Sequence, residues 1–170
     1  CATKHCNNSV MTELRLTRPG RAEIEIKRSR FIALSRPAAS VEEARALLAD
    51  ARAEFPDARH HCSAYVVSVP SAQPILHSSD DGEPSGTAGR PMLDVLTGNE
   101  LMDVAVVVVR YFGGTLLGTG GLVRAYSDAV REVLSGEPVT RRITRPLMRV
   151  TAMHATAGKL EADLRGRGFD

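Results

Sequence analysis

The pattern of apolar residues along the chain predicts one deeply buried strand and two amphipathic helices. The run from Val104 to Val109 is apolar without interruption, which is typical of a strand covered on both faces and therefore central in its sheet. Residues 41–55 carry apolar side chains at helical spacing behind Ser40, which opens a capping box. Residues 122–134 have the same spacing and end before Gly136, so we predict a second helix there.

Two further segments are predicted to be strands. Residues 21–34 begin with strict alternation of apolar and polar positions, which predicts a half-buried strand with Lys27, Arg28 and Arg30 at its centre. Such charges either protect a sheet edge that faces water or contact an anion, and charge runs are usually solvated, which favours the first interpretation. Residues 60–69 predict another strand.

Four residues are candidate ligands for a transition metal: His60, His61, Cys62 and His77. Their spacing matches no zinc pattern, and neighbouring side chains on a strand point to opposite faces of the sheet. We therefore interpret the histidines as core or rim residues and Cys62 as a small buried hydrophobe, and we assign no metal site.

An acidic, glycine-rich loop covers residues 80–90 and contains Asp80, Asp81 and Glu83. Three carboxylates can hold a hard cation, but the order of residues lacks the calcium-loop pattern. Two carboxylates can also act as acid and base when one pKa is raised. The alternative is a turn in which Asp and Ser side chains bond local backbone N–H groups. From the sequence alone these alternatives stay open.

A second glycine-rich loop, residues 113–121, follows the buried strand. It fails as a phosphate-binding loop because Thr119 stands at the lysine position, and as a dinucleotide fingerprint because Val123 stands at the third glycine position. Gly120 and Gly121 precede the predicted helix, whose free N–H groups and dipole make that end an anion site. An interpretation with equal support is a glycine turn that permits close packing of helix and sheet.

Composition narrows the class of protein. The chain has 170 residues, 43% of them apolar, which suits a domain of medium size with a largely aliphatic core. Its net charge of +2 is too small for a bulk nucleic-acid footprint, so such a contact must use local basic patches. The three cysteines show no paired framework, which predicts a reducing, cytoplasmic location. No apolar run approaches the roughly 18 residues of a membrane span.

Changes in pattern divide the chain into segments. We interpret residues 1–19 as an N-terminal extension, partly non-native, because the first ten residues precede a plausible initiator, Met11. Residues 20–138 form the predicted main domain, and residues 139–146 a basic linker.

The end of the chain predicts a strand over residues 147–153 and a helix over residues 157–165. One strand and one helix cannot close a core alone. We therefore interpret residues 147–170 as the start of an incomplete second domain.

Motifs in the predicted main domain resemble the YigZ/IMPACT family. The most specific motif fixes the residue type at Gly89, Met92, Leu93, Leu96, Leu101, Val107, Val108, Arg110, Tyr111, Phe112, Gly113, Gly114, Leu117 and Gly118. Flanking motifs of the same family resemble residues 27–32, 60–65 and 80–84. The resemblance covers roughly residues 20–135.

The resemblance implies an α+β fold. It implies a two-layer α/β sandwich like the second domain of ribosomal small-subunit protein five and domain IV of elongation factor G, followed by the start of a ferredoxin-like domain. Eukaryotic members of the family are similar to regulators that compete for the activator of a translation-control kinase. For bacterial members the fold suggests contact with nucleic acid or the ribosome, which is an analogy between folds.

We therefore predict a non-enzymatic binding or regulatory protein linked to translation, which contacts RNA, the ribosome or a translation-control partner through a basic, glycine-rich surface. In this hypothesis the two glycine-rich loops lie side by side and display Arg110 to an anionic partner. The predicted contact residues are Lys27, Arg28, Arg30, Arg90, Arg110, Gly113, Gly114, Gly120, Gly121 and Arg124, with further support from Arg141, Arg142 and Arg145. No catalytic residue, metal or cofactor is assigned.

Two alternatives come from other functional classes. One is an enzyme that acts on a phosphorylated small molecule or nucleotide with the carboxylates of Asp80, Asp81 and Glu83. The other is a pure protein-interaction domain, in which every glycine-rich and acidic motif serves turns and packing. An uncharged or acidic face around residues 113–121 favours the last of these.

Overall fold

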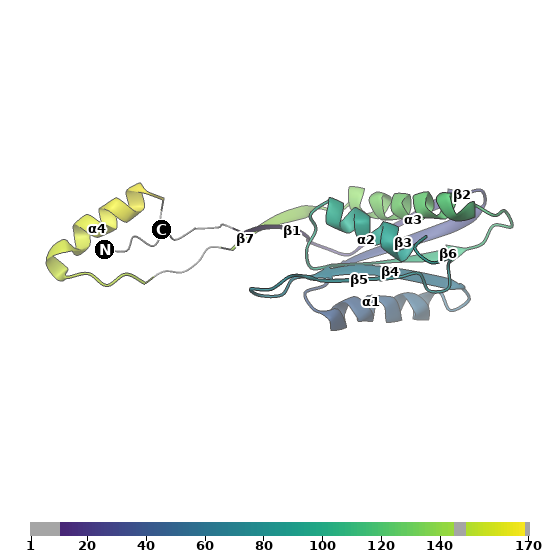
Figure 1. Cartoon of the computed structure of the whole chain (residues 1–170), viewed down its shortest axis with the longest axis horizontal. Coiled ribbons are helices and arrows are strands. Elements are labelled where there is room, and N and C mark those ends of the chain that lie inside the picture. Colours follow the sequence, from purple (N-terminus) through teal and green to yellow (C-terminus); the bar gives the residue numbers. More distant parts are fainter. Residues whose placement is uncertain (1–10, 145–148, 169–170) are drawn as a thin grey trace. The chain divides into compact units, whose positions relative to one another are not determined.

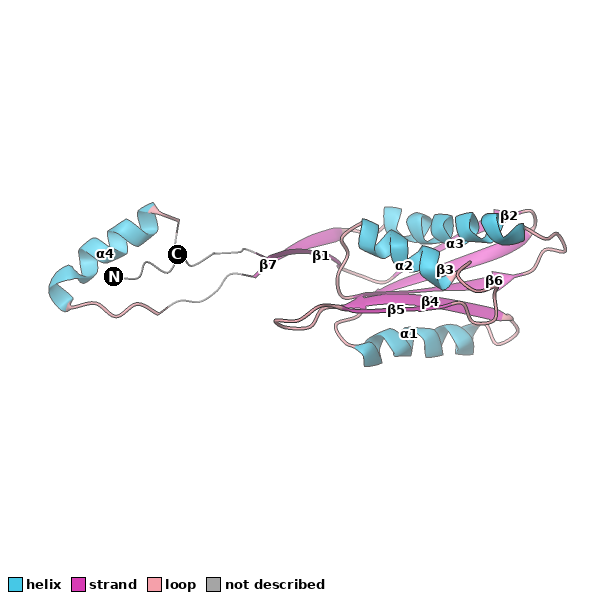
Figure 2. Cartoon of the chain, in the orientation of Figure 1, coloured by secondary structure: helices cyan, strands magenta, loops and turns pink. Residues whose placement is uncertain are grey.

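The computed structural model describes residues 11–144 and 149–168. The chain divides into a larger compact unit, Thr12–Ile143, and a smaller one that contains helix α4 (His154–Gly166). Figure 1 labels the elements along the chain, and the colours of Figure 2 show that the larger unit combines strands and helices.

A five-stranded sheet forms the centre of the larger unit, and every neighbouring pair of its strands is antiparallel. Across the sheet the strands are β2 (Gly20–Ile26), β3 (Ser29–Pro37), β6 (Val104–Tyr111), β4 (His60–Val67) and β5 (Ile75–Ser79). An antiparallel sheet combined with helices confirms the predicted α+β class.

Strand β6 is the middle strand of this sheet, as its apolar run predicted. Val106 and Val108 belong to the hydrophobic cluster on one face, and Val107 and Val109 belong to the cluster on the other. All four side chains are buried, since each face of the sheet is covered by helices.

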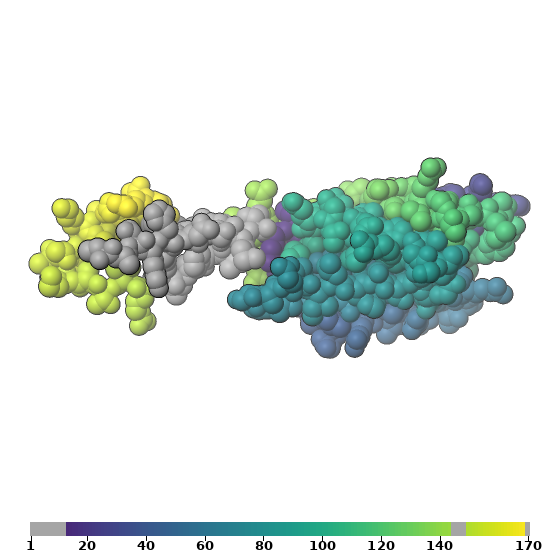
Figure 3. All heavy atoms as spheres, in the orientation of Figure 1, coloured from purple at the N-terminus to yellow at the C-terminus, as the bar shows by residue number. Residues whose placement is uncertain are grey.

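The larger unit has three layers rather than the predicted two. Helices α2 (Gly89–Gly98) and α3 (Gly118–Ser135) cover one face of the sheet, and α1 (Val41–Glu54) covers the other (Figure 1). The two-layer description fails because α1 buries its own apolar stripe, including Leu47, against the second face. In Figure 3 the teal atoms of α2 and its neighbouring segments form a continuous surface.

Helix α1 has the predicted capping box. Ser40 Oγ accepts a hydrogen bond from the Glu43 N–H at 3.2 Å, and the Glu43 carboxylate accepts one from the Ala39 N–H at 2.7 Å. The helix ends at Glu54, just before Pro56, which cannot continue it.

Residues 21–34 are not one strand, as predicted, but the two strands of a hairpin. β2 and β3 are joined by a two-residue turn of Lys27 and Arg28, whose φ angles are +48° and +65°. Two consecutive positive φ angles give the turn a twist that suits a hairpin, although Asn and Gly are the usual residues there. Because neither residue is a typical turn former, the pattern conceals the turn.

A separate two-stranded sheet joins β1 (Met11–Leu16) to β7 (Val139–Thr144). The segment interpreted as a basic linker therefore begins with a strand. β1 also contacts the main part of the unit, since the Met102 N–H donates to the Leu14 carbonyl at 2.8 Å and Leu16 is buried. Residues 1–10, interpreted as partly non-native, lie outside the described residues.

The predicted helix over residues 157–165 is present as α4, which buries none of its side chains. Of the strand predicted over 147–153, residues 147 and 148 lie outside the described part of the chain, and residues 149–153 have no regular secondary structure. Within the described residues, no helix is long and apolar enough to cross a lipid bilayer.

Candidate functional site

Both glycine-rich loops reach the same end of the five-stranded sheet. Arg110, near the end of β6, lies opposite Phe31 of β3 and His60 of β4, and Glu83 of the acidic loop contacts Arg110. We call this region the glycine-rich end. It comprises the turn at residues 27–28, residues 57–60, the acidic loop 80–88 and the loop 112–117.

The β2–β3 turn packs directly on the second glycine-rich loop. The Gly113 N–H donates to Ser29 Oγ at 3.1 Å, and Arg28 Nη2 donates to Thr115 Oγ1 at 3.4 Å. A Cβ on Gly113 would lie closer than 3.0 Å to backbone atoms of Arg28 and Ser29, so only glycine allows this approach. Lys27 and Arg28 stay exposed beside the loop.

The second glycine-rich loop is shorter than predicted. Helix α3 begins at Gly118, so Gly120 and Gly121 lie inside its first turn rather than before it. Gly114 and Gly118 have φ angles of +85° and +74°, which explains the glycines at these two positions. The residue before the helix, Leu117, supplies no side-chain cap, so the first N–H groups of α3 have no side-chain acceptor there.

Arg110 is not displayed at the surface, so the prediction that it faces an anionic partner is wrong. Its side chain is 8% exposed, and Nη1 donates to Glu83 Oε1 at 2.7 Å. The guanidinium lies 5.6 Å from the ring centre of Phe31 and 5.7 Å from that of Phe112. The sequence could not reveal this pairing because Glu83 meets Arg110 only in the folded sheet.

Glu83 receives a second hydrogen bond in the core. Tyr126 of α3 donates its hydroxyl to Glu83 Oε1 at 2.8 Å, and Cys62 Sγ lies 3.4 Å from the Tyr126 oxygen and 3.0 Å from the Asp80 carbonyl. Burial raises the pKa of Cys62 to about 12. The thiol therefore stays protonated at neutral pH, which confirms Cys62 as a small buried hydrophobe.

Asp80 organises the acidic loop through backbone hydrogen bonds. Its carboxylate accepts from the N–H groups of Gly86 at 2.8 Å, Ala88 at 3.0 Å and Gly89 at 2.8 Å. Burial alone would raise its pKa, but these three donors outweigh burial and lower the pKa. A raised pKa for acid–base work is thus absent at Asp80, and the local turn is the correct alternative for this residue.

Asp81 ties the acidic loop to β4 and α1. Its carboxylate accepts from the His61 N–H at 2.7 Å and from Arg52 at 2.9 Å, and its carbonyl lies 2.9 Å from His60 Nδ1. His61 is buried with Nε2 3.0 Å from the Phe55 carbonyl, whereas His60 is half-buried. One histidine is thus a core residue and the other a rim residue, as predicted.

Two of the predicted contact residues are engaged in exposed ion pairs. Arg30 bonds Glu23 at 2.7 Å and Arg90 bonds Asp94 at 2.8 Å. The hydrogen bond from Arg30 lowers the pKa of Glu23. Exposed pairs of this kind are weak, so either arginine can exchange its carboxylate for another anion at little cost.

The remaining basic candidates are exposed. Arg124 lies on the surface of α3, and Arg141 and Arg142 lie on β7. Arg145 lies outside the described residues. Lys27, Arg28, Arg124, Arg141 and Arg142 therefore hold positive charge that an external partner can reach.

The glycine-rich end contains a hollow of about 450 Å³ that was not predicted from the sequence. Its lining residues are Asp57, Arg59, His60, Arg110, Tyr111, Phe112 and Leu116. Phe112 is 56% exposed and Leu116 is 81% exposed, which is unusual for large apolar side chains beside a cluster of charges. The one available signal was Phe112 itself, an aromatic residue that directly follows the buried strand.

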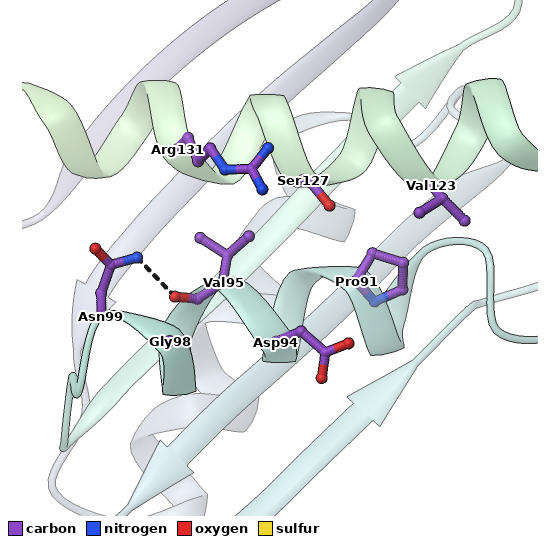
Figure 4. Close-up of a pocket in the computed structure, with 8 residues that line it drawn as sticks. All are labelled: Pro91, Asp94, Val95, Gly98, Asn99, Val123, Ser127 and Arg131. Carbon is purple, nitrogen blue, oxygen red and sulfur yellow. Dashed lines mark hydrogen bonds between the residues drawn. The ribbon is translucent and has the colours of Figure 1, made fainter.

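A second hollow, of about 360 Å³, lies between α2 and α3 (Figure 4). Its polar side chains serve the helices: Asn99 donates to the Val95 carbonyl at 2.7 Å, and Arg131 bonds Asp128 at 2.8 Å. None of the predicted contact residues lines it. The candidate site is therefore the glycine-rich end.

The described residues contain no group of three or more His, Cys, Asp or Glu side chains that could hold a metal ion. His77, the fourth candidate ligand, instead stacks on Tyr65 with the ring centres 4.7 Å apart. Burial and the nearby charge of Arg45 lower the pKa of His77.

Comparison with known proteins identifies relatives of this chain. The Impact N-terminal domain family matches residues 27–134. The chain is 54% identical over 110 residues to the IMPACT family member YigZ of Escherichia coli K12, a match that covers 65% of this chain and 54% of that protein. It is 42% identical over 150 residues to the IMPACT family member YvyE of Bacillus subtilis 168, covering 88% of this chain and 68% of that protein.

A crystal structure of a hypothetical protein is similar as well, with a TM-score of 0.74 and 43% identity over 91% of this chain and 75% of that one. The chain spans about half the length of the first curated relatives that it matches. The family match covers more than half of this chain, and it includes the β2–β3 turn, the acidic loop and α3. This chain belongs to the IMPACT family.

Proposed function

We propose that the chain is a non-enzymatic binding module of the translation apparatus that contacts RNA through its glycine-rich end. The link to translation is what membership of the IMPACT family implies. The contact with RNA rests on the charge and the exposed apolar surface of this end. The likeness to ribosomal small-subunit protein five and to elongation factor G domain IV remains a prediction. The start of an incomplete ferredoxin-like domain at residues 147–170 remains a prediction as well.

The observation that carries the proposal is a set of exposed cations at the same end of the sheet as an exposed aromatic ring. Lys27, Arg28 and Arg59 are exposed, and none forms an ion pair with a carboxylate within the described residues. Phe112 lies in the hollow that Arg59 also lines. Residues 112–127 contain no Asp or Glu. Cations that contact phosphates, together with a ring that stacks on bases, are the usual means of binding single-stranded nucleic acid.

The uncapped beginning of α3 supports the same function. Its first N–H groups and the helix dipole favour an anion near Gly118, next to the loop that packs against Arg28. Arg28 therefore places a positive charge beside this loop. A pure protein-interaction domain would be favoured by an uncharged or acidic face here.

The enzymatic alternative loses its support because its three carboxylates have internal partners. Asp80 binds three backbone N–H groups, Asp81 binds Arg52 and the His61 N–H, and Glu83 binds Arg110 and Tyr126. Each of the three carboxylates is thus already engaged within the protein. Turns and packing are sufficient to explain all three.

Binding of labelled RNA, measured by fluorescence anisotropy at about 50 and about 200 mM salt, tests the proposal. We expect the affinity of the unchanged protein for RNA to fall as the salt concentration rises. The double variant Lys27→Glu/Arg28→Glu should bind more weakly, and its slope of log K against log salt should be smaller in magnitude by about 1 to 2. The control Arg36→Glu/Arg45→Glu changes the net charge equally, at residues outside the glycine-rich end. The proposal is rejected if the unchanged protein does not bind RNA, or if both double variants lose the same affinity. Absence of binding leaves the protein-interaction alternative.

A further inference from the structure

The hollow at the glycine-rich end has the size and lining of a ligand site. Its volume of about 450 Å³ falls within the roughly 300–1,000 Å³ of small-molecule sites. Its walls combine the apolar surface of Tyr111, Phe112 and Leu116 with four charged or polar side chains that can orient a ligand. The hollow is distinct from the exposed cations Lys27 and Arg28, which do not line it.

Phe112 offers a flat apolar surface at this hollow. The Arg110 guanidinium lies 5.7 Å from the centre of its ring, and 56% of the residue is exposed. Arg110 is itself fixed by its bond to Glu83, so the ring is supported from the core side. A supported aromatic ring with an exposed surface is a platform for stacking a planar group.

His60 adds a hydrogen-bond acceptor of fixed orientation. Its Nδ1 lies 2.9 Å from the Asp81 carbonyl, which only accepts hydrogen bonds, so the proton of the neutral ring is on Nδ1. Nε2 of that tautomer is an acceptor, and no hydrogen bond to it occurs within the described residues. An amino group on a planar ligand can donate to this nitrogen.

The other polar groups of the hollow are an acid and a cation. Tyr111 donates its hydroxyl to Asp57 Oδ1 at 2.8 Å, and both burial and this bond raise the pKa of Tyr111. The second carboxylate oxygen of Asp57 remains available as an acceptor. Arg59 is exposed and suits a phosphate at the rim.

We propose that this hollow holds one unstacked base of an RNA strand, stacked on Phe112 and hydrogen-bonded by His60. This inference rests on the proposed function and specifies its ligand as single-stranded rather than double-stranded RNA. The bases of a duplex are stacked and paired, so their faces cannot reach the ring. Arg59 at the rim favours a phosphate backbone over an uncharged peptide as the occupant.

The test compares two RNAs of about ten nucleotides, one single-stranded with a 2-aminopurine base and one fully paired. We expect the unchanged protein to prefer the single strand and to quench 2-aminopurine fluorescence. Phe112→Leu keeps an apolar side chain but removes the ring, so we expect about tenfold weaker binding of the single strand, loss of the quenching and an unchanged salt slope. Thermal unfolding checks that this variant folds.

The matched control is Leu76→Ala, which truncates a side chain that is 50% exposed on the edge strand β5, and it should bind like the unchanged protein. Salt-dependent binding that Phe112→Leu does not weaken overturns the base site and leaves the proposed function intact. Equal binding of both RNAs likewise overturns the base site and leaves the proposed function intact. A protein that binds neither RNA removes the proposed function and the base site together.

Discussion

Arg110 and Glu83 form an ion pair in the interior of the protein, with 2.7 Å between Nη1 and Oε1 and side chains that are 8% and 3% exposed. The pair connects the end of the central strand to the acidic loop, and Tyr126 attaches α3 to the same carboxylate oxygen. Arg110 Nε is buried without an acceptor, so the guanidinium depends on Glu83 for its neutralisation. The pair therefore holds the acidic loop, the sheet and α3 in one arrangement.

Glu83→Gln should destabilise the protein strongly, because it leaves the buried guanidinium of Arg110 without a counter-charge. Removing one partner of a buried pair costs about 3–5 kcal/mol. Urea unfolding followed by circular dichroism measures this loss. Adding Arg110→Met to Glu83→Gln should recover most of it, because no charge then remains buried.

The control for this experiment is Arg30→Gln, which breaks an exposed ion pair with Glu23 whose side chains are 49% and 45% exposed. We expect a loss of about 1 kcal/mol or less there. If Glu83→Gln costs no more than Arg30→Gln, the buried pair does not have the structural role described above.

Asp80→Asn should reduce stability at neutral pH and have no effect in strong acid. The folded protein lowers the pKa of Asp80 through three backbone donors, so the unfolded state takes up a proton first as pH falls. The Asp80 carboxylate therefore contributes about 1–2 kcal/mol to the free energy of unfolding, by comparison with helix caps. This contribution is complete above the ordinary pKa of an aspartate and is lost as pH falls through the lowered pKa of the folded state.

The measurement is the difference in unfolding free energy between the unchanged protein and Asp80→Asn over a series of pH values. Asp94→Asn serves as the control, because Asp94 forms an exposed pair on α2 that should contribute about 0.5 kcal/mol or less. A difference for Asp80→Asn that stays constant from neutral pH into strong acid would contradict the assigned hydrogen bonds.

The sequence was informative where one local signal sufficed. The apolar run of β6 predicted a central strand, and the spacing of Ser40 and Glu43 predicted the start of α1, because burial and capping depend on nearby residues. The hairpin of β2 and β3 was missed because Lys27 and Arg28 have positive φ angles without being glycine or asparagine.

Other features depend on contacts between distant residues. Alternation and spacing cannot reveal that Glu83 neutralises Arg110, because the two residues meet only when the acidic loop packs on the sheet. The beginning of α3 was predicted too late because glycine is a poor helix former, yet α3 begins at Gly118 and includes Gly120 and Gly121. The hollow beside Phe112 is lined by residues of two separate segments, 57–60 and 110–116.

Two glycines of the same predicted loop should respond in opposite ways to alanine. Gly113→Ala places a Cβ against the backbone of Arg28 and Ser29, which cannot move without shifting the hairpin, so we expect a loss of about 3 kcal/mol. Gly120 lies inside α3, and an added Cβ there would meet no atom within 4 Å apart from its chain neighbours and the nearby backbone of its own helix. Gly120→Ala should therefore stabilise the protein by about 0.5–1 kcal/mol, because alanine favours the helix. Thermal and urea unfolding measure both values, and a stabilising Gly113→Ala would show that the hairpin does not pack on this loop.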